Sequence, residues 1–203
     1  MRRWDSFFVV LAVTMSLVAC GSDRTGGPRG EPQAVVDASP DRTILALGAA
    51  FDATAPDAER NGEVEFGAGG RVTVAEDGRN AVRHPELDDP ASVVDLVRGA
   101  LAAVAYGGAA VRGASTFRYE TVINVERAVA ETPADGKARM EAFAAALGAP
   151  AFYADVWIDG EGRLRRIQVP VEKTTKRPPD RSKVLPRLIT VDFFDFATTP
   201  PPP

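Results

Sequence analysis

Hydrophobic and polar residues alternate most regularly in the second half of the chain. The apolar positions of residues 115–125 share one face of an extended strand: Phe117, Tyr119, Ile123 and Val125. Residues 152–158 alternate in the same way, and the Asp-Gly-Glu-Gly sequence that follows them is typical of a hairpin loop. Such alternation predicts strands with one buried and one wet face, as antiparallel sheets have. We therefore predict that residues 154–159 and 163–169 pair as a hairpin, with a final strand over residues 188–196.

Helical spacing appears in two other segments. Asp89-Pro90 has the order of an N-cap followed by a proline in the first helical turn, and apolar residues then recur at helical spacing as far as Val104. Gly107 is expected to end this helix. A second helix is predicted over residues 136–147, closed by Gly148 and Pro150. Each helix has one apolar face, which favours packing against a sheet.

The first part of the chain gives weaker signals. Residues 44–50 form a short apolar run that suits a strand or a helix. Residues 63–66 and 71–74 alternate and predict strands, with glycines turning the chain between them and a further short strand near residues 80–83. Together these elements predict an α+β fold, in which an antiparallel sheet carries helices on one face.

The N-terminus has a pattern of its own. Arg2 and Arg3 precede a nearly continuous apolar run over residues 7–18, which suits a signal peptide and falls short of the ~20 residues that span a bilayer. The run ends in Leu17-Val18-Ala19-Cys20, which resembles the lipobox of bacterial lipoproteins. We predict that residues 1–19 are removed and that a lipid on Cys20 anchors the protein to the extracytoplasmic face of the cell membrane. The alternative is an ordinary secretory signal followed by a chance cysteine.

Composition sets the predicted domain organisation. Residues 20–41 are rich in Gly, Pro, Ser and charge, which predicts a flexible tether behind the lipidated cysteine. Residues 42–197 suit a single domain, and the proline-rich residues 198–203 suit a disordered tail. The formal net charge of −4 is not the basic balance of a nucleic-acid-binding protein. With one cysteine, the chain forms no intramolecular disulfide.

No pattern in the chain indicates catalysis, a cofactor or a metal. The single histidine, His84, precedes a proline in a polar stretch and is expected in an exposed loop. No Cys/His cluster has metal-ligand spacing, and no nucleophile or phosphate-binding motif occurs. Asp155 and Asp159 would lie ~13 Å apart along a strand, too far for a catalytic carboxylate pair. We predict a protein that is not an enzyme and has no cofactor.

Several segments resemble the LppX/LprG-type envelope lipoproteins of actinobacteria. They are Asp89-Pro90, Arg112-Gly113-Ala114-Ser115-Thr116-Phe117-Arg118-Tyr119, the hairpin of residues 154–166, and the closing strand of residues 189–196 before its prolines. The resemblance covers about residues 89 to 200. It implies a LolA-like half-barrel, a curved antiparallel sheet with two main helices on its concave face around an apolar cavity that binds lipid or glycolipid. Before residue 89 the strands are contracted relative to the family, which predicts a smaller cavity or none.

Two interpretations of the concave face remain open. The predicted cavity-lining residues are Val97, Leu101, Phe117, Tyr119, Phe143, Phe152, Val156 and Val191. If the helices stand off the sheet, these residues form a lipid-binding groove and the protein is a lipid or glycolipid carrier. If the helices fill the concave face, the same residues are core. The protein is then a tethered interaction or sensor module, whose envelope partner the sequence does not name.

The segment over residues 163–187 is strongly basic. It holds nine basic residues against two acidic ones, and its prolines favour a mobile loop. The predicted contacts to anionic lipid headgroups are Lys173, Lys176, Arg177, Arg181 and Lys183. The alternative is a solvated loop whose charges only aid solubility.

Overall fold

The computed structural model describes residues 28, 30–66, 72–77, 84–175 and 187–197. Cys20, the signal segment, the C-terminal prolines and residues 176–186 of the basic segment lie outside these residues, so the predictions made for them are not tested by the fold. The predicted strand near residues 80–83 lies outside them as well.

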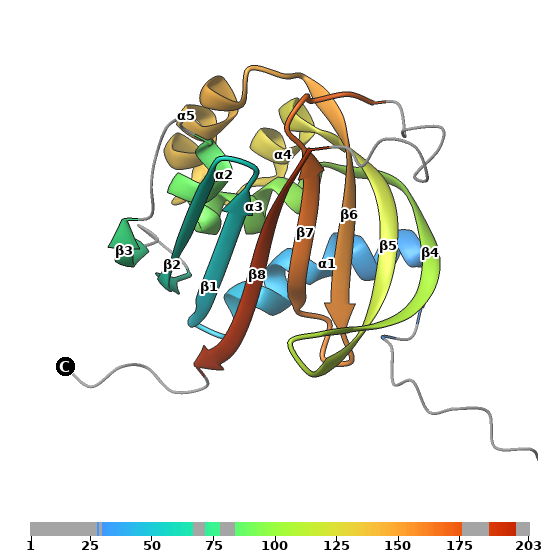
Figure 1. Cartoon of the computed structure of the whole chain (residues 1–203). Coiled ribbons are helices and arrows are strands. Elements are labelled where there is room, and N and C mark those ends of the chain that lie inside the picture. Colours follow the sequence, from blue (N-terminus) through green and yellow to red (C-terminus); the bar gives the residue numbers. More distant parts are fainter. Residues whose placement is uncertain (1–27, 29, 67–71, 78–83, 176–186, 198–203) are drawn as a thin grey trace, which may run out of the picture.

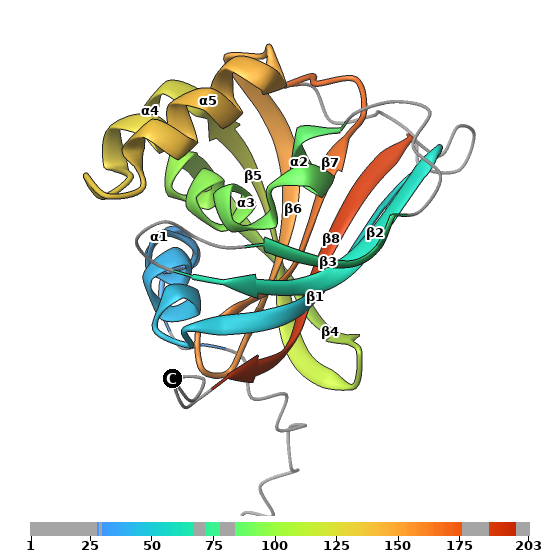
Figure 2. The same cartoon turned by 90° about the vertical axis from the view of Figure 1, so that its left-hand side faces the viewer.

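Eight strands of the described chain form one antiparallel sheet in the order β3-β2-β1-β8-β7-β6-β5-β4 (Figure 1). The strands are β1 (Gly48–Ala55), β2 (Ala58–Glu65), β3 (Val72–Asp77), β4 (Ala100–Val111), β5 (Ala114–Asn124), β6 (Ala151–Asp159), β7 (Leu164–Pro170) and β8 (Leu188–Ala197). Neighbours in the sheet are also neighbours in sequence, except that the last strand, β8, pairs with β1. The sheet curves strongly around one side (Figure 2).

The helices lie on the concave side of this sheet (Figure 2). They are α1 (Pro32–Ile44), α2 (Pro85–Asp88), α3 (Pro90–Leu96), the 3-10 turn η1 (Val97–Gly99), α4 (Val125–Glu131) and α5 (Lys137–Leu147). The predicted α+β class, with a curved antiparallel sheet and helices on its concave face, is confirmed. The predicted second helix is α5, and Gly148 ends it in the left-handed conformation.

The tether predicted over residues 20–41 is wrong from residue 32 onward, because α1 begins there and packs into the fold. Its residues Val35, Val36, Ser39 and Thr43 are buried along one helix face. The Thr43 hydroxyl accepts a hydrogen bond of 2.9 Å from the Leu164 amide of β7 and donates one of 2.7 Å to the Ser39 carbonyl. The polar composition of this segment conceals a buried face made of small residues.

The helix predicted from Pro90 to Val104 is shorter than expected. Asp89 caps it as predicted by accepting a 3.0 Å hydrogen bond from the Ser92 amide, but α3 ends at Leu96 and β4 begins at Ala100. A Cβ on Gly99 would lie 2.1 Å from the Asn124 carbonyl oxygen, so only glycine lets the chain turn here against β5. The small residues that follow continue as an edge strand.

The strands β5 to β8 follow the sequence pattern closely, whereas β1 and the first half of β2 extend beyond the residues predicted as strand. The predicted hairpin is confirmed, with Val156 paired to Ile167 and Trp157 to Arg166. The open assignment of residues 44–50 resolves into the end of α1 and the start of β1. Val125 is not the end of a strand as predicted. Asn124 accepts a hydrogen bond from the Arg127 amide and thereby caps α4, which the alternation does not indicate.

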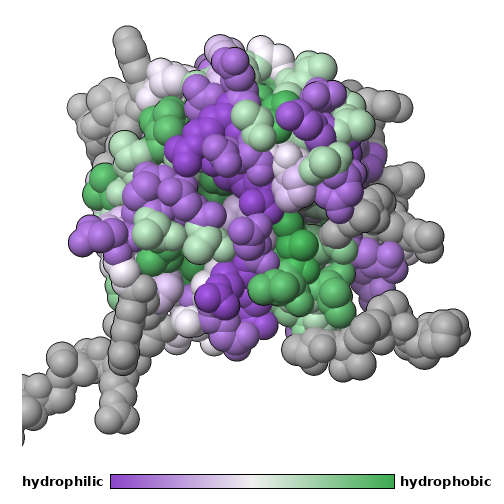
Figure 3. All heavy atoms as spheres, turned by 180° about the vertical axis from the view of Figure 1, so that it is seen from behind, coloured by the Kyte–Doolittle hydropathy of each residue, from purple (hydrophilic) through white to green (hydrophobic). Residues whose placement is uncertain are grey.

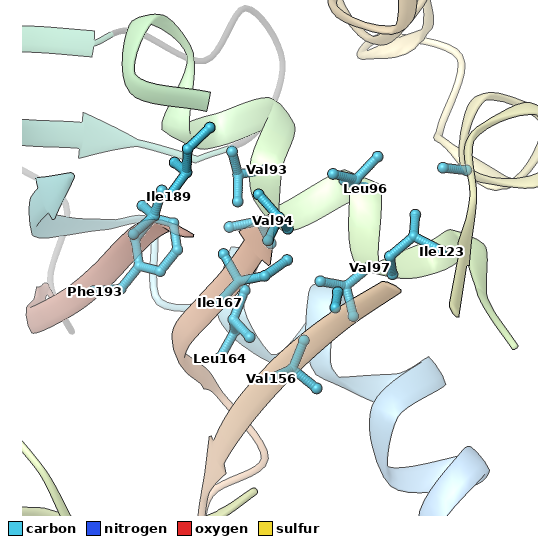
Figure 4. Packing of buried hydrophobic residues seen from close by; sticks show 14 of the residues in the cluster. Val93, Val94, Leu96, Val97, Ile123, Val156, Leu164, Ile167, Ile189 and Phe193 are labelled. Atoms are coloured by element: carbon cyan, nitrogen blue, oxygen red, sulfur yellow. The ribbon is translucent and has the colours of Figure 1, made fainter. Parts of the chain in front are cut away.

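The core lies between the helix layer and the concave face (Figure 4). The α3–η1 segment contributes buried residues that face apolar side chains of β5, β6, β7 and β8. The residues seen together there are Val93, Val94, Leu96, Val97, Ile123, Val156, Leu164, Ile167, Ile189 and Phe193. At roughly 25 cal/mol per Å² of buried apolar surface, this interface is the main source of stability.

Replacing Thr43 with valine tests how α1 is held. Thr43→Val keeps the shape of the side chain but leaves the buried Leu164 amide without its acceptor, so we expect the free energy of unfolding to fall by about 1–3 kcal/mol in chemical denaturation. Thr54→Val, at an exposed position of β1, is the control and should change it little. Equal effects of the two substitutions would show that α1 does not depend on this hydrogen bond.

Candidate functional site

Six of the eight predicted cavity-lining residues are buried, and the core cluster contains them: Val97, Tyr119, Phe143, Phe152, Val156 and Val191. Phe117 is partly buried beside that cluster. Leu101 lies on the other face, because it pairs with Val122 on the outer side of β5, and 37% of it is exposed. The concave-face assignment therefore holds for the strands, and it fails for Leu101 because Leu101 belongs to β4 and not to a helix.

Three pockets on the described chain are open surface features. One of about 410 Å³ lies between α1 and the β6–β7 turn, and one of about 530 Å³ adjoins it at Arg42 and Glu161. A third of about 330 Å³ lies where β1, β2 and β8 meet near Leu47. None of the three is lined by a predicted cavity residue. From the helix side, hydrophilic side chains cover most of the surface and hydrophobic ones gather toward its lower part (Figure 3).

The rim of the apolar interior is closed on one side by α2, a helix of four residues. It contacts β1 and β8 of the sheet as well as α3 and α5 of the helix layer. Leu87 is its large apolar residue in the core. A short segment with one apolar anchor has little burial to hold it, so its polar contacts matter.

Two ion pairs and one histidine–carboxylate hydrogen bond fasten this segment, and we call these three pairs the α2 latch. Lys173 follows the end of β7, and its Nζ lies 2.6 Å from Glu86 Oε1. Two further pairs join the segment to the β1–β2 hairpin: Arg60 to Asp88 at 2.7 Å and His84 to Asp57 at 2.8 Å. The latch therefore connects three segments that are distant in the sequence.

The Glu86–Lys173 pair is the most buried part of the latch. Glu86 is only 1% exposed, and neither carboxylate oxygen makes a hydrogen bond of good geometry although the ammonium group is close. Lys173 also donates to the Pro170 carbonyl at 3.1 Å and lies 5.6 Å from the Phe152 ring centre. Burying two charges is costly, and a pair with incomplete hydrogen bonding recovers only part of that cost.

His84 is not the exposed loop residue that the sequence predicts, because it is 7% exposed and paired with Asp57. The hydrogen bond from His84 lowers the pKa of the Asp57 carboxyl, against a smaller opposing effect of burial. A carboxyl whose pKa falls on folding stabilises the fold above its ordinary pKa. That contribution is lost as the pH falls through the lowered value, so acidification weakens this part of the latch.

The predicted headgroup contact Lys173 is wrong, because its ammonium group is turned inward to Glu86. The other four predicted contacts, Lys176, Arg177, Arg181 and Lys183, lie outside the described residues and remain predictions. The three arginines at the start of the basic segment are also paired: Arg163 and Arg165 with Asp159, and Arg166 with Asp192. Their charges are largely neutralised within the sheet.

The outer face of the sheet carries a row of such pairs. Arg118 binds Asp155 at 2.8 Å and Glu120 at 3.2 Å, and its guanidinium lies 5.4 Å from the Trp157 ring centre. Further along, Asp192 is shared by Arg166 and by Arg112 from the β4–β5 turn. These carboxylates are buried and each is bonded to arginine, which is the arrangement of structural ion pairs.

No group of His, Cys, Asp and Glu side chains among the described residues could hold a metal ion. No described helix is long and apolar enough to cross a membrane.

The arrangement of elements is similar to that of three solved structures. LprF from Mycobacterium bovis shares 12% identity over 87% of this chain and 97% of that chain, with a TM-score of 0.48. Lipoprotein LppX from Mycobacterium tuberculosis shares 14% identity over 85% and 99%, with a TM-score of 0.43. A LolA superfamily protein from Nitrosomonas europaea shares 9% identity over 86% and 96%, with a TM-score of 0.31.

The second and third of these structures carry the LppX and LolA names that the sequence resemblance implies. At such identities and scores the likeness concerns the arrangement of strands and helices alone. No protein-family model matches the chain, and no curated protein sequence matches it.

A double-mutant cycle tests the buried pair of the latch. Lys173→Met leaves the Glu86 carboxylate buried without its partner, so we expect the free energy of unfolding to fall by about 3–5 kcal/mol. Lys173→Met combined with Glu86→Met should recover most of that loss, because two packed apolar side chains need no compensation. Lys137→Met, at an exposed position of α5, is the control. A double variant as unstable as Lys173→Met would show that the two charges do not depend on each other.

Proposed function

We propose that this chain is a lipid-anchored envelope lipoprotein that is not an enzyme and that binds a lipid or glycolipid by its acyl chains. The observation that carries this proposal is the Glu86–Lys173 pair, a buried ion pair at the rim of an otherwise apolar interior. A rim that only had to stay closed would gain from apolar residues at these positions. When the ion pair is formed, it closes the interior. When the two charged groups are separated and the interior is open, water solvates both of them well.

Lipid entry needs α2 to swing away from the rim. The segment is held by the burial of Leu87 and by the three pairs of the latch, so its opening costs far less than unfolding the sheet. Acyl chains that replace the α2 contacts would gain roughly 0.8 kcal/mol for each buried methylene, which offsets the cost of separating α3 from the sheet. No catalytic group is needed for this exchange.

A second candidate function is supported by the packing itself. Val97, Phe152 and Val156 are fully buried, and the three open pockets of the described residues lie elsewhere. In this case the core is permanently filled, and the protein is a tethered interaction or sensor module that binds an envelope partner through its surface.

Native mass spectrometry of the protein purified from its own membranes separates the two candidates. The carrier function predicts a fraction with the added mass of a lipid held without a covalent bond. Asp88→Asn weakens the latch at Arg60, so this variant should lose the bound lipid faster. Asp41→Asn weakens a contact of the same 2.7 Å length to Arg98, at a more exposed carboxylate outside the latch, and should retain the lipid. Wild-type protein free of lipid in repeated preparations would favour the filled-core module.

The anchor is tested separately at Cys20. Cys20→Ala removes the thiol that receives the lipid, so we expect the variant to remain unprocessed by the lipoprotein pathway. It should also lack the mass of covalently bound acyl chains, which an intact-mass measurement detects on the wild-type protein. A Cys20→Ala variant that still carries this mass would rule out Cys20 as the anchor.

A further inference from the structure

The edge strand β4 lacks the features that usually protect a sheet edge. It runs for 12 residues, Ala100–Val111, with no charged residue and no proline. Among the described residues, β5 is its only neighbouring strand. Long uncharged edges readily pair with another strand, and natural proteins usually block them with charges, prolines or short strands. This edge is therefore available for pairing.

Exposed apolar side chains gather on the outer face of the same strand. Leu101, Val104 and Tyr106 are 37%, 55% and 48% exposed, and they lie within six residues of one another. Val104 pairs with Glu120, an outer-face residue of β5, and the Tyr106 ring lies 5.5 Å from the Arg118 guanidinium on that face. The register of β4 on β5 shifts between Leu101 and Val104 and again between Ala105 and Gly107, and the three side chains lie on the outer face.

The start of the edge is already occupied from within the chain. The Gln33 side chain of α1 donates to the Ala100 carbonyl at 3.0 Å and accepts from the Ala103 amide at 2.8 Å. Backbone groups point to the same side at every second residue of a strand. The amide and carbonyl of Ala105 are therefore the next pair directed toward the open side.

We propose that β4 pairs with β4 of a second copy of this chain, antiparallel and about a two-fold axis through Ala105. This register places Val104 opposite Tyr106 of the other copy, so the two most exposed apolar side chains of the strand cover each other. An uncharged strand pairs with itself without opposing like charges. A two-fold arrangement is closed and stops at the dimer.

A second copy fits this edge better than a foreign strand. The edge offers no charged side chain by which a particular foreign partner would be selected, whereas in the two-fold pairing the apolar stripe meets its own equivalent. Two copies tethered to one membrane also meet at a raised effective concentration, so a modest edge contact suffices.

Disulfide cross-linking in membranes tests this pairing with the full exported chain. Ala105→Cys places a thiol on the axis, where Cα atoms of a hydrogen-bonded antiparallel pair lie about 5.5 Å apart, within the disulfide range. Ala109→Cys is the matched control, because it is exposed on the same strand but lies roughly 26 Å from its copy in this register. We expect a covalent dimer with Ala105→Cys, and a yield about tenfold lower with Ala109→Cys.

A charge introduced into the edge strand by substitution provides a second variant. Val104→Lys added to Ala105→Cys puts a charge into the apolar contact and should abolish the dimer, whereas Leu45→Lys, at an exposed apolar position elsewhere, should leave it unchanged. Equal dimer yields from Ala105→Cys and Ala109→Cys, or a dimer that survives Val104→Lys, would overturn the pairing. Absence of any dimer would overturn it as well. A dimer of wild-type chain under oxidation would instead show a free Cys20 thiol, which contradicts the lipid anchor and not the edge pairing.

Discussion

The close approach of the α3–η1 segment to the concave face is the constraint on which the rest of the structure depends. Gly99 touches the Asn124 carbonyl so closely that no side chain fits between them. The helix ends at this contact, and the chain continues into β4, which pairs with β5. Asn124 itself caps α4, so one point of contact fixes both the edge of the sheet and the start of the next helix.

The strands of the second half could be predicted from the sequence because their signals are local. Residues 154–169 alternate cleanly and carry their own turn, so the hairpin needs no distant information. α1 and β4 could not be predicted in this way. Their residues are small and only weakly patterned, and their structures depend on contacts with Leu164 and Asn124 far along the chain.

The candidate site was predictable only in its apolar part. The alternation assigns Tyr119, Phe152 and Val156 to the concave face correctly, because a strand's side-chain period settles which residues share a face. The α2 latch joins residues more than 20 positions apart, and no spacing in the sequence indicates it. The presence of Glu86 and Asp88 in a helix of four residues, next to the only histidine, is the one local sign of it.

The ion pairs on the outer face of the sheet differ from those of the α2 latch in the elements that they connect. Those of the outer face lie within one rigid sheet, where arginines bind the carboxylates of adjacent strands. Those of the latch connect a short helix to the β1–β2 hairpin and to the segment that follows β7. The most direct test of an interior that opens for lipid is a crystal structure of the protein purified from its own membranes without removal of bound lipid. We predict density for an acyl chain between α3 and β6–β7, with Lys173 separated from Glu86. An interior packed as described here, with the Glu86–Lys173 pair intact and no lipid beside it, would contradict the account.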